Sequence, residues 1–242
     1  MKQARPAPQA PQRILVVDAG GSNIKLMRSG IADRIKFESG PTFTPRLLMA
    51  GIRKYAAHWE YDAVTLGLPI PVVHDRPVRE PNNLGRGWTK FDFPAAFGKP
   101  TRLINDAAMQ ALGSYEGGRM LFLGLGTGLG SAMIIDNVLV PMELGELSYT
   151  QRFTFEDMLG RDGRKRLGDK KWAEALDRIV TILCTAFVTD YVIIGGGNAR
   201  KLGRLPKGAR LGDNRNAFIG GLRLWGIGMR ALGGRTLPMV IR

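Results

Sequence analysis

Three short segments of this chain combine glycine, carboxylate, amide and hydroxyl groups in patterns suited to handling a phosphate group. In the first, VVDAGGSNIKL, an apolar run ends at Asp18, directly before the glycines of a predicted turn. Glycine amides at such a turn can point at an anion. A carboxylate beside a phosphate needs a cation between the two charges, so Asp18 is a candidate Mg²⁺ anchor, directly or through water. The predicted phosphate-binding residues are Gly20, Gly21, Ser22, Asn23 and Lys25. An ordinary hairpin is the alternative, because Gly-Gly-Ser-Asn is also good turn chemistry.

The second segment, LGLGTGLGSA, concentrates four glycines and a threonine hydroxyl at one predicted turn between apolar strands. Glycine that extends into a strand costs about 0.5–1 kcal/mol, and a plain hairpin needs only one or two. The surplus favours a second cradle, in which backbone amides and a hydroxyl hold phosphate oxygens. Its candidate residues are Gly126, Thr127, Gly128 and Gly130.

The third segment, LINDAAMQ, brings Asn105 and Asp106 to the start of a predicted helix. Both residue types are common helix caps, which is one interpretation. The other makes Asp106 a general base that accepts the proton of an attacking hydroxyl, with Asn105 orienting the same substrate. General base catalysis typically contributes 10²- to 10⁴-fold in rate.

The elements that position these segments are predicted by hydrophobic periodicity. Short apolar runs alternate with helical stripes from Ile14 onward, which indicates an α/β fold. The two glycine hairpins resemble each other, as expected of two related lobes that face a cleft. Residues 69–100 hold six prolines and are predicted as long loops. The predicted strands are 14–18, 24–27, 63–66, 103–105, 120–125, 131–135 and 191–194, and the predicted helices follow the stripes at 48–59, 107–115, 172–187 and 217–225.

Composition excludes several classes of protein. The 242 residues are 44% apolar and 23% charged, without the run of about 18 apolar residues that a membrane span needs. One cysteine and two histidines argue against a zinc site. Residues 1–13 lack the apolar stretch of a secretory signal, so we expect a flexible tail and a cytoplasmic protein.

The net charge of +14 attracts anionic partners, but it does not choose among them. Basic residues cluster at 161–171, with six basic and two acidic residues, and at 200–215, with six and one. A solvated surface explains such clusters, and a track for an anionic polymer such as polyphosphate is the alternative. A helix-turn-helix signature is missing from the sequence, so we expect no nucleic-acid partner.

Four segments in this order resemble the phosphate-1, catalytic, phosphate-2 and adenosine motifs of the actin-like sugar-kinase superfamily: VVDAGGSNIKL, LINDAAMQAL, LGLGTGLGSAMIIDNVLVPMELGEL and VIIGGGNARKL. Within it the chain resembles the ROK family, and most of all its short polyphosphate/ATP glucokinase branch. The resemblance covers residue 14 to about residue 226. It implies a two-lobed α/β fold of ribonuclease-H-like, actin-like ATPase topology with a central cleft.

The resemblance implies a role for individual residues. Asp106 corresponds to the base that activates the sugar 6-hydroxyl, and Asn105 to a sugar ligand. Asn83, in PNNLGRGW, matches another sugar contact, and Glu143 matches the first residue of a Glu-x-Gly-His motif. Three glycines fall where the nucleoside of the donor would pack: Gly195, Gly196 and Gly197.

The resemblance also implies domain boundaries. After the tail at 1–13, we predict an N-terminal lobe at 14–104 and a C-terminal lobe at 105–225. A C-terminal helix at about 226–242 is predicted to complete the N-terminal lobe.

Two departures from the family pattern affect the acceptor site. The motif ends in Glu146 instead of histidine, so a group that donates and accepts becomes a carboxylate that, when ionised, only accepts. Glu146 therefore joins the predicted sugar-binding residues. Ile70 replaces a glycine, and its branched side chain is predicted to narrow the pocket.

We therefore expect a Mg²⁺-dependent kinase, forming a homodimer, that moves a phosphoryl group from polyphosphate or ATP to the 6-hydroxyl of a hexose, first of all glucose. The two departures keep open a kinase for another hexose or an N-acetylhexosamine. They also keep open a sugar-binding sensor that has lost turnover.

Overall fold

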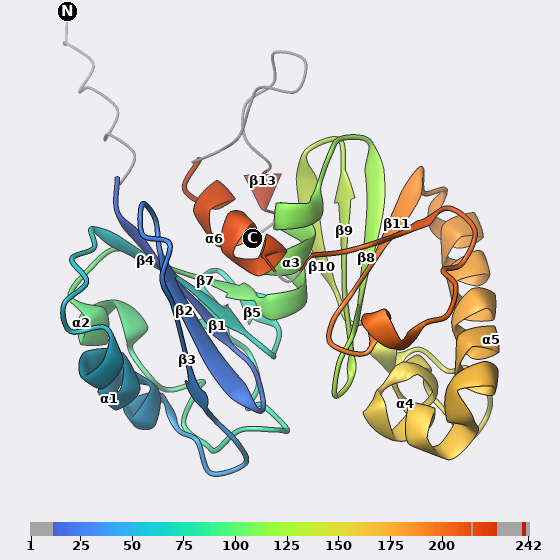
Figure 1. The fold of residues 1–242 in the computed structure, drawn as a ribbon, viewed down its shortest axis with the longest axis horizontal. Helices are drawn as coiled ribbons and strands as arrows, with labels where there is room; N and C mark the ends of the chain where they lie inside the picture. Colours follow the sequence, from blue (N-terminus) through green and yellow to red (C-terminus); the bar gives the residue numbers. More distant parts are fainter. Residues whose placement is uncertain (1–11, 214, 227–238, 241–242) are drawn as a thin grey trace, which may run out of the picture.

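The protein forms two lobes, each built on a β-sheet (Figure 1). The structure is a computed structural model that describes residues 12–213, 215–226 and 239–240. Its mixed sheets and covering helices confirm the predicted α/β class. The first sheet contains β1 (Ile14–Ala19), β2 (Asn23–Arg28), β3 (Arg34–Glu38), β4 (Ala63–Leu68) and β7 (Thr101–Asn105), in the order β3-β2-β1-β4-β7.

The second sheet lies in the C-terminal lobe, in the order β12-β11-β8-β9-β10-β13. Its strands are β8 (Arg119–Leu125), β9 (Leu129–Ile135), β10 (Val138–Met142), β11 (Tyr191–Gly195), β12 (Ala209–Leu211) and β13 (Met239–Val240). Most of the predicted helix at about 226–242 lies outside the described residues. Its Met239 and Val240 pair in parallel with β10, so this part is strand.

Both predicted glycine hairpins are present. In the first, β1 and β2 pair antiparallel, and Asp18 lies opposite Lys25. In the second, β8 and β9 pair antiparallel, with Leu125 opposite Leu129 at the turn. β1 is buried along its whole length because it also pairs with β4 and has helices on both faces of the sheet.

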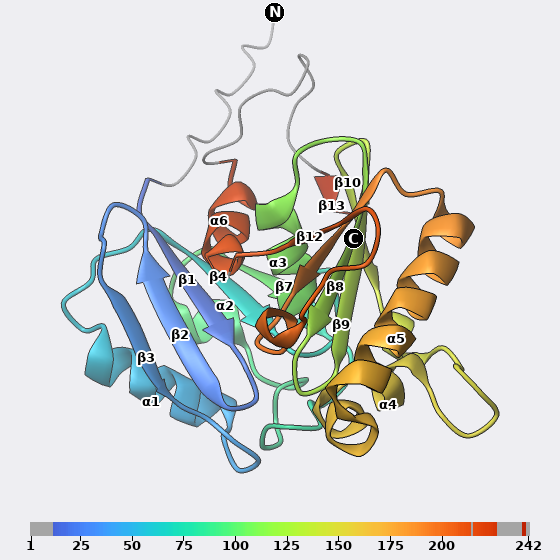
Figure 2. The same ribbon diagram turned by 45° about the vertical axis from the view of Figure 1, so that its right-hand side comes forward.

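The helices form three layers that alternate with the two sheets (Figure 2). Helices α1 (Pro45–Tyr55) and α2 (Phe93–Phe97) cover the outer face of the first sheet, and α4 (Phe155–Leu159) and α5 (Arg161–Phe187) cover that of the second. Helices α3 (Asp106–Ser114) and α6 (Asn216–Arg223) fill the space between the sheets. The short elements of the loops are β5 (Val72–Val73), β6 (Arg76–Pro77), η1 (Leu144–Glu146) and η2 (Ala199–Lys201).

Three elements differ from the sequence prediction. Helix α5 is kinked at Gly168, where φ is 72° and the backbone is not helical, and the part after the kink corresponds to the predicted stripe at 172–187. The part before the kink was not predicted, because its turns are basic and largely exposed and show no apolar stripe. The prolines at 69–100 did not prevent a short helix, since Pro94 lies in the first turn of α2, where its ring is tolerated. Helix α6 falls within the range predicted for the C-terminal lobe, yet it packs on β1 and β4 of the first sheet. None of the described helices is long and apolar enough to cross a bilayer.

Glycines allow α3 and α6 to approach each other closely. A Cβ on Gly113 would lie 1.8 Å from the backbone oxygen of Asn216, and one on Gly220 would lie 1.8 Å from that of Met109. These contacts are with backbone, so they cannot be relieved by a side-chain rotation. The crossing holds α3 between the sheets and thereby sets the position of its first residue.

We expect Gly113→Ala to lower the free energy of unfolding by about 1–3 kcal/mol, because overpacking outweighs the better helix propensity of alanine. Urea denaturation measures the loss. Gly203→Ala is the matched control, since a Cβ there has no atom within 4 Å. Equal stability of the two variants would contradict a tight crossing.

Candidate active site

A cavity of about 400 Å³ lies where the two lobes meet. Sixteen of the predicted site residues line it: Gly20, Gly21, Ser22, Asn23, Lys25, Asn83, Asn105, Asp106, Gly126, Thr127, Gly128, Gly130, Glu143, Glu146, Gly196 and Gly197. Two predicted residues are not part of the lining. Asp18 lies beneath the first turn with only 5% of its surface exposed, and Gly195 packs against the ring of Phe122.

The junction of β7 and α3 delivers Asn105 and Asp106 to the cavity. Asn105 is the N-cap of α3, since its Oδ1 accepts the Ala108 N–H at 3.0 Å. The capping interpretation is therefore correct for Asn105. Its Nδ2 donates to the Ile70 carbonyl at 3.3 Å, which fixes the amide where it faces the cavity. Asp106 follows as the first helical residue, and its Oδ1 accepts the N–H of Ala107 at 2.7 Å.

Asp106 has the electrostatics of a base. Its pKa is raised to about 7, mainly by burial and in addition by the charges of Asp18 and Glu143. The Ala107 N–H and the charge of Lys25 act in the opposite direction. A carboxyl with a pKa near 7 is half ionised near neutral pH, and when ionised it is a far stronger base than an ordinary aspartate.

The first glycine turn is held close to the cavity by an ion pair. Lys25 Nζ lies 2.8 Å from Asp18 Oδ2, across the β1–β2 ladder. Gly21 packs under the loop that carries Asn83, and a Cβ there would lie 2.9 Å from the Cβ of Asn83. Glycine is therefore required at this contact, and it brings a predicted sugar residue directly over a predicted phosphate turn.

The second glycine turn approaches the start of α3. A Cβ on Gly130 would lie 2.8 Å from the Cβ of Ala107, so only glycine lets β9 pass so close to the helix. Both turns and the Asp106 carboxylate therefore line the same cavity. The arrangement can hold an anion on backbone amides while a neighbouring carboxylate removes a proton from a hydroxyl.

Three further side chains lie beside the second glycine turn, and the sequence indicates only Arg161 among them, as a member of the basic cluster at 161–171. Arg161 Nη2 donates to Thr127 Oγ1 at 2.8 Å, and Asn198 Nδ2 donates to the Gly126 carbonyl at 2.9 Å. Glu156 Oε2 accepts the Leu129 N–H at 3.0 Å. All three side chains line the cavity. The basic run gave a signal for Arg161 that a solvated surface also explained, and the sequence context gave no signal for Asn198 or Glu156.

The loop after β6 carries the predicted sugar residue Asn83, and two further residues of this loop, Arg79 and Glu80, also line the cavity. Glu80 organises the loop by accepting backbone N–H groups from Gly87, Trp88 and Thr89 at 2.9–3.1 Å. The buried ring of Trp88 packs against Phe93, so its role is structural.

Arg79 precedes Glu80 in this loop. Its guanidinium lies 3.2 Å from Glu143 Oε2 and 3.4 Å from Glu146 Oε1. Ile70, predicted to narrow the pocket, is one of the residues that line the cavity, and most of its side chain packs into the core of the first lobe, which leaves it 2% exposed.

The chain is similar to curated polyphosphate glucokinases, although no family model matches it. Polyphosphate glucokinase of Mycobacterium tuberculosis is 27% identical over 84% of this chain and 83% of the relative. Polyphosphate glucokinase of Mycobacterium leprae is 27% identical over 78% of this chain and 64% of the relative.

Solved structures share the fold. The inorganic polyphosphate/ATP-glucomannokinase of Arthrobacter sp. strain KM superposes with a TM-score of 0.75 at 24% identity, covering 90% of this chain and 98% of that chain. A ROK family glucokinase of Streptomyces griseus, in complex with glucose and AMPPNP, gives 0.68 at 18% identity, covering 88% and 98%. These likenesses confirm the predicted two-lobed α/β fold of the actin-like ATPase type.

The raised pKa of Asp106 predicts a pH-dependent stability difference. The unfolded carboxyl ionises near pH 3.8 and the folded one near pH 7, so the folded state loses stability as the pH rises from about 4 to 7. Asp106→Asn escapes this loss, and we expect it to be more stable than the wild type at pH 8 by at least about 1 kcal/mol, with a smaller gain at pH 5.

Urea unfolding at both pH values measures this difference. Asp33→Asn, in an exposed loop, is the matched control and is expected to show the same stability change at both. A gain from Asp106→Asn that is independent of pH would contradict a buried, protonatable Asp106.

Proposed function

We propose that the chain is a sugar kinase of the ROK family and that it phosphorylates the 6-hydroxyl of glucose, with Asp106 as the catalytic base; its similarity to polyphosphate glucokinases and its fold support this proposal. The observation that carries the proposal is the position of this carboxylate. It lies in the cavity between the lobes, with a raised pKa, and both glycine turns line the same space. The alternative of a sugar sensor without turnover lacks support, because the base and both turns are in place.

The proposed reaction is an in-line phosphoryl transfer. The O6–P bond to the sugar forms as the bond between the terminal phosphoryl group and the rest of the donor breaks. The O6 proton passes to Asp106, and the shortened donor leaves as an anion. The amides of both turns, with Lys25 and Arg161, hold the phosphate oxygens in position.

The acceptor residues come from both lobes. Asn83 and Asn105 present amides, while Glu143 and Glu146 present carboxylates that can accept hydrogen bonds from sugar hydroxyls. Glu156, beside the second turn, offers a further acceptor. A ring of amides and carboxylates suits the many hydroxyls of a hexose, and it supports a hexose as the acceptor class.

The residues near the first turn fit Mg²⁺, which proteins bind through one or two carboxylates together with water and substrate phosphates. Asp18 is the proposed anchor, directly or through water. Its charge helps raise the pKa of Asp106, so the two carboxylates lie close to each other. The described residues hold no cluster of three or more His, Cys, Asp or Glu side chains, and a site completed by donor phosphates does not need one. When bound, the ion would offset the negative charge of those phosphates.

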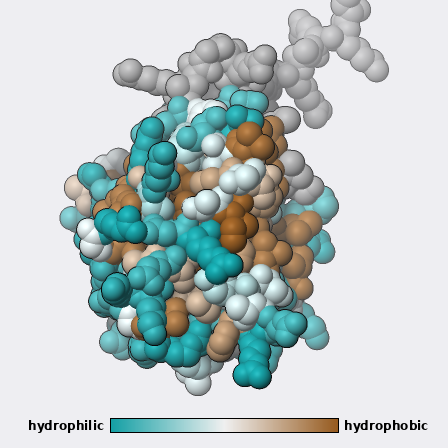
Figure 3. Space-filling model, turned by 90° about the vertical axis from the view of Figure 1, so that its right-hand side faces the viewer, coloured by the Kyte–Doolittle hydropathy of each residue, from teal (hydrophilic) through white to brown (hydrophobic). Residues whose placement is uncertain are grey.

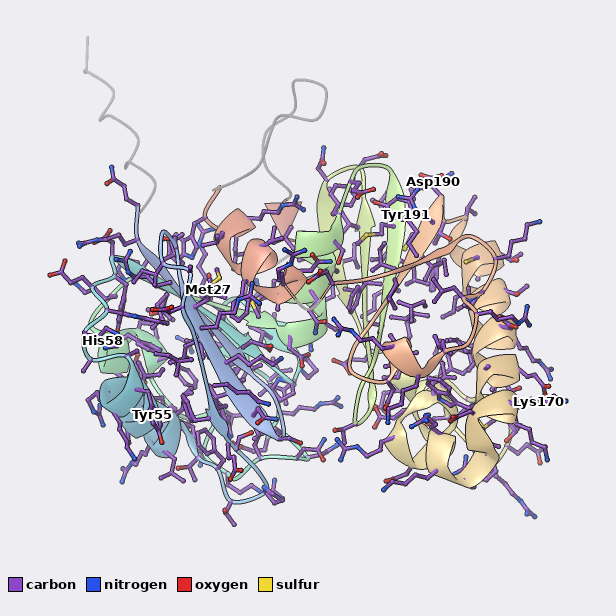
Figure 4. The ribbon with its side chains drawn as sticks, viewed as in Figure 1. Met27, Tyr55, His58, Lys170, Asp190 and Tyr191 are labelled. Atoms are coloured by element: carbon purple, nitrogen blue, oxygen red, sulfur yellow. The ribbon has the colours of Figure 1, made fainter. Side chains whose placement is uncertain are left out.

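We propose polyphosphate or ATP as donor, in line with the names of the Mycobacterium and Arthrobacter relatives. Arg161 is the cation of the basic cluster at 161–171 that lines the cavity. Gly196 and Gly197 line it near Asn198 and are proposed to contact the distal part of the donor. Lys170, in contrast, lies on the outer face of α5 (Figure 4), a face that is largely hydrophilic (Figure 3).

Asp106→Asn is expected to fold and to bind sugar but to lose at least ~10²-fold in kcat.

In the wild type, kcat/KM is expected to fall about tenfold per pH unit below pH 7, because only ionised Asp106 accepts the proton. A coupled assay over a panel of hexoses, each with ATP and with polyphosphate, measures both effects. Asp33→Asn is the control for a charge change alone, and near wild-type turnover by Asp106→Asn would refute the assignment.

Arg161→Gln is expected to raise the KM for polyphosphate about tenfold, which corresponds to one charged hydrogen bond of about 1.4 kcal/mol. The KM for sugar is expected to stay unchanged. Lys165→Gln is the matched control, because Lys165 lies on the same helix and pairs with the exposed Asp162.

The dependence of the KM for polyphosphate on salt tests the electrostatic role of Arg161. Between 50 and 300 mM salt, the wild-type KM for long polyphosphate is expected to rise, and the Arg161→Gln variant to rise less steeply. A flat wild-type response would remove the electrostatic contribution to donor binding.

A further inference from the structure

One short turn of the second lobe presents two carboxylates on the same side. Glu143 and Glu146 flank the 3₁₀ turn η1, and the Glu146 N–H donates to the Glu143 carbonyl at 3.1 Å. In a 3₁₀ helix, side chains three positions apart eclipse one another. Both carboxylates therefore lie at the acceptor end of the cavity, where they repel each other unless a cation separates them.

That cation comes from the other lobe. Arg79 lies in the loop that follows β6, and it reaches across the cavity to Glu143 at 3.2 Å and Glu146 at 3.4 Å, one carboxylate for each terminal nitrogen. A guanidinium can bridge two carboxylates in this way because its donors form a rigid fork. All three side chains remain partly exposed, so the contact is accessible to a ligand that enters the cavity.

The contact between Arg79 and Glu143 affects the ionisation of Glu143. Burial raises the pKa of Glu143, Arg79 lowers it, and Glu146 and Glu156 raise it again. Asp106 adds a further negative charge from α3. The guanidinium therefore favours the ionised form of Glu143 against burial and three neighbouring carboxyl groups.

We propose that Arg79 is a positioning residue for the acceptor sugar, which holds the Glu143 carboxylate turned into the cavity while Glu146 anchors the guanidinium from the other side. The acceptor end is then complete only when the loop after β6 lies against the second lobe. This inference rests on the proposed function, because it takes Glu143 as a hydrogen-bond acceptor for sugar hydroxyls. Arg79 itself does not touch the reacting atoms.

A positioning role predicts a specific kinetic pattern. Arg79→Met is expected to raise the KM for glucose about tenfold and to leave the KM for the donor unchanged. The loss is expected to grow as the pH falls, because Glu143 takes up a proton more readily once the guanidinium is gone. Arg79→Lys is expected to recover part of the affinity, since one ammonium carries the charge but not the fork.

Glu146 provides the second arm of the test. Glu146→Gln removes one sugar acceptor but keeps the contact between Arg79 and Glu143, so its effect on the KM for glucose is expected to be smaller than that of Arg79→Met. In the double variant Arg79→Met/Glu146→Gln, removal of a repelling carboxylate is expected to restore part of the affinity that Arg79→Met loses. Arg76→Met, an exposed arginine of β6, is the matched control and is expected to bind glucose like the wild type.

Calorimetric titration with glucose, together with the coupled assay, distinguishes a failure of the positioning role of Arg79 from a failure of the proposed function. Equal glucose affinity of the wild type and Arg79→Met overturns the positioning role, whatever the turnover. An unfolding midpoint lowered in Arg79→Met with unchanged sugar affinity also overturns it, in favour of a purely structural contact. Weaker glucose binding by Arg79→Met supports it even if the wild type phosphorylates no hexose, a result that would overturn only the proposed function. Absence of binding by any hexose would overturn both.

Discussion

The packing of α3 between the two sheets is the constraint on which the site depends. The helix starts directly at the end of β7, its Ala107 lies against Gly130, and Gly113 and Gly220 permit the close crossing with α6. The first residue of the helix, Asp106, therefore enters the cavity that both glycine turns line. The burial that fixes the helix is also the largest cause of the raised pKa of this carboxyl. Packing and acid–base chemistry thus have one origin.

Each of three cationic side chains that line the cavity is held in one orientation by an ion pair or a hydrogen bond. Lys25 lies 2.8 Å from Asp18, and Arg161 donates to the hydroxyl of Thr127. Arg79 is shared between the two carboxylates that flank η1. Each pair joins a cation to a residue with a proposed role in the site. A guanidinium or ammonium that is already oriented loses less side-chain entropy when a substrate binds.

Local patterns in the sequence predict the parts of the site that local interactions build. Both glycine hairpins and the strand–helix junction at Asp106 follow from residue types within about ten positions of each other. The contacts of Arg79 and Arg161 were missed because their partners lie 64 and 34 residues away along the chain. Their own neighbourhoods resemble ordinary charged surface. The start of α5 was missed for a related reason, since exposed basic turns show no apolar period. His58, for which no role was expected, lies at the outer edge of the first lobe, on the side remote from the second lobe (Figure 4).

The pairing of the outer basic residues argues that the donor is recognised within the cavity and not along the surface. Arg164, Arg204 and Arg210 each lie within 2.8 Å of a carboxylate from the same lobe. A polyanion on this surface would compete with those carboxylates for the three paired arginines. ATP and polyphosphate present the same terminal phosphoryl group to Arg161 and the glycine amides. Discrimination between the two proposed donors would therefore arise beyond that group, and Gly196 and Gly197, which line the cavity, are the residues proposed to contact the part of the donor that differs.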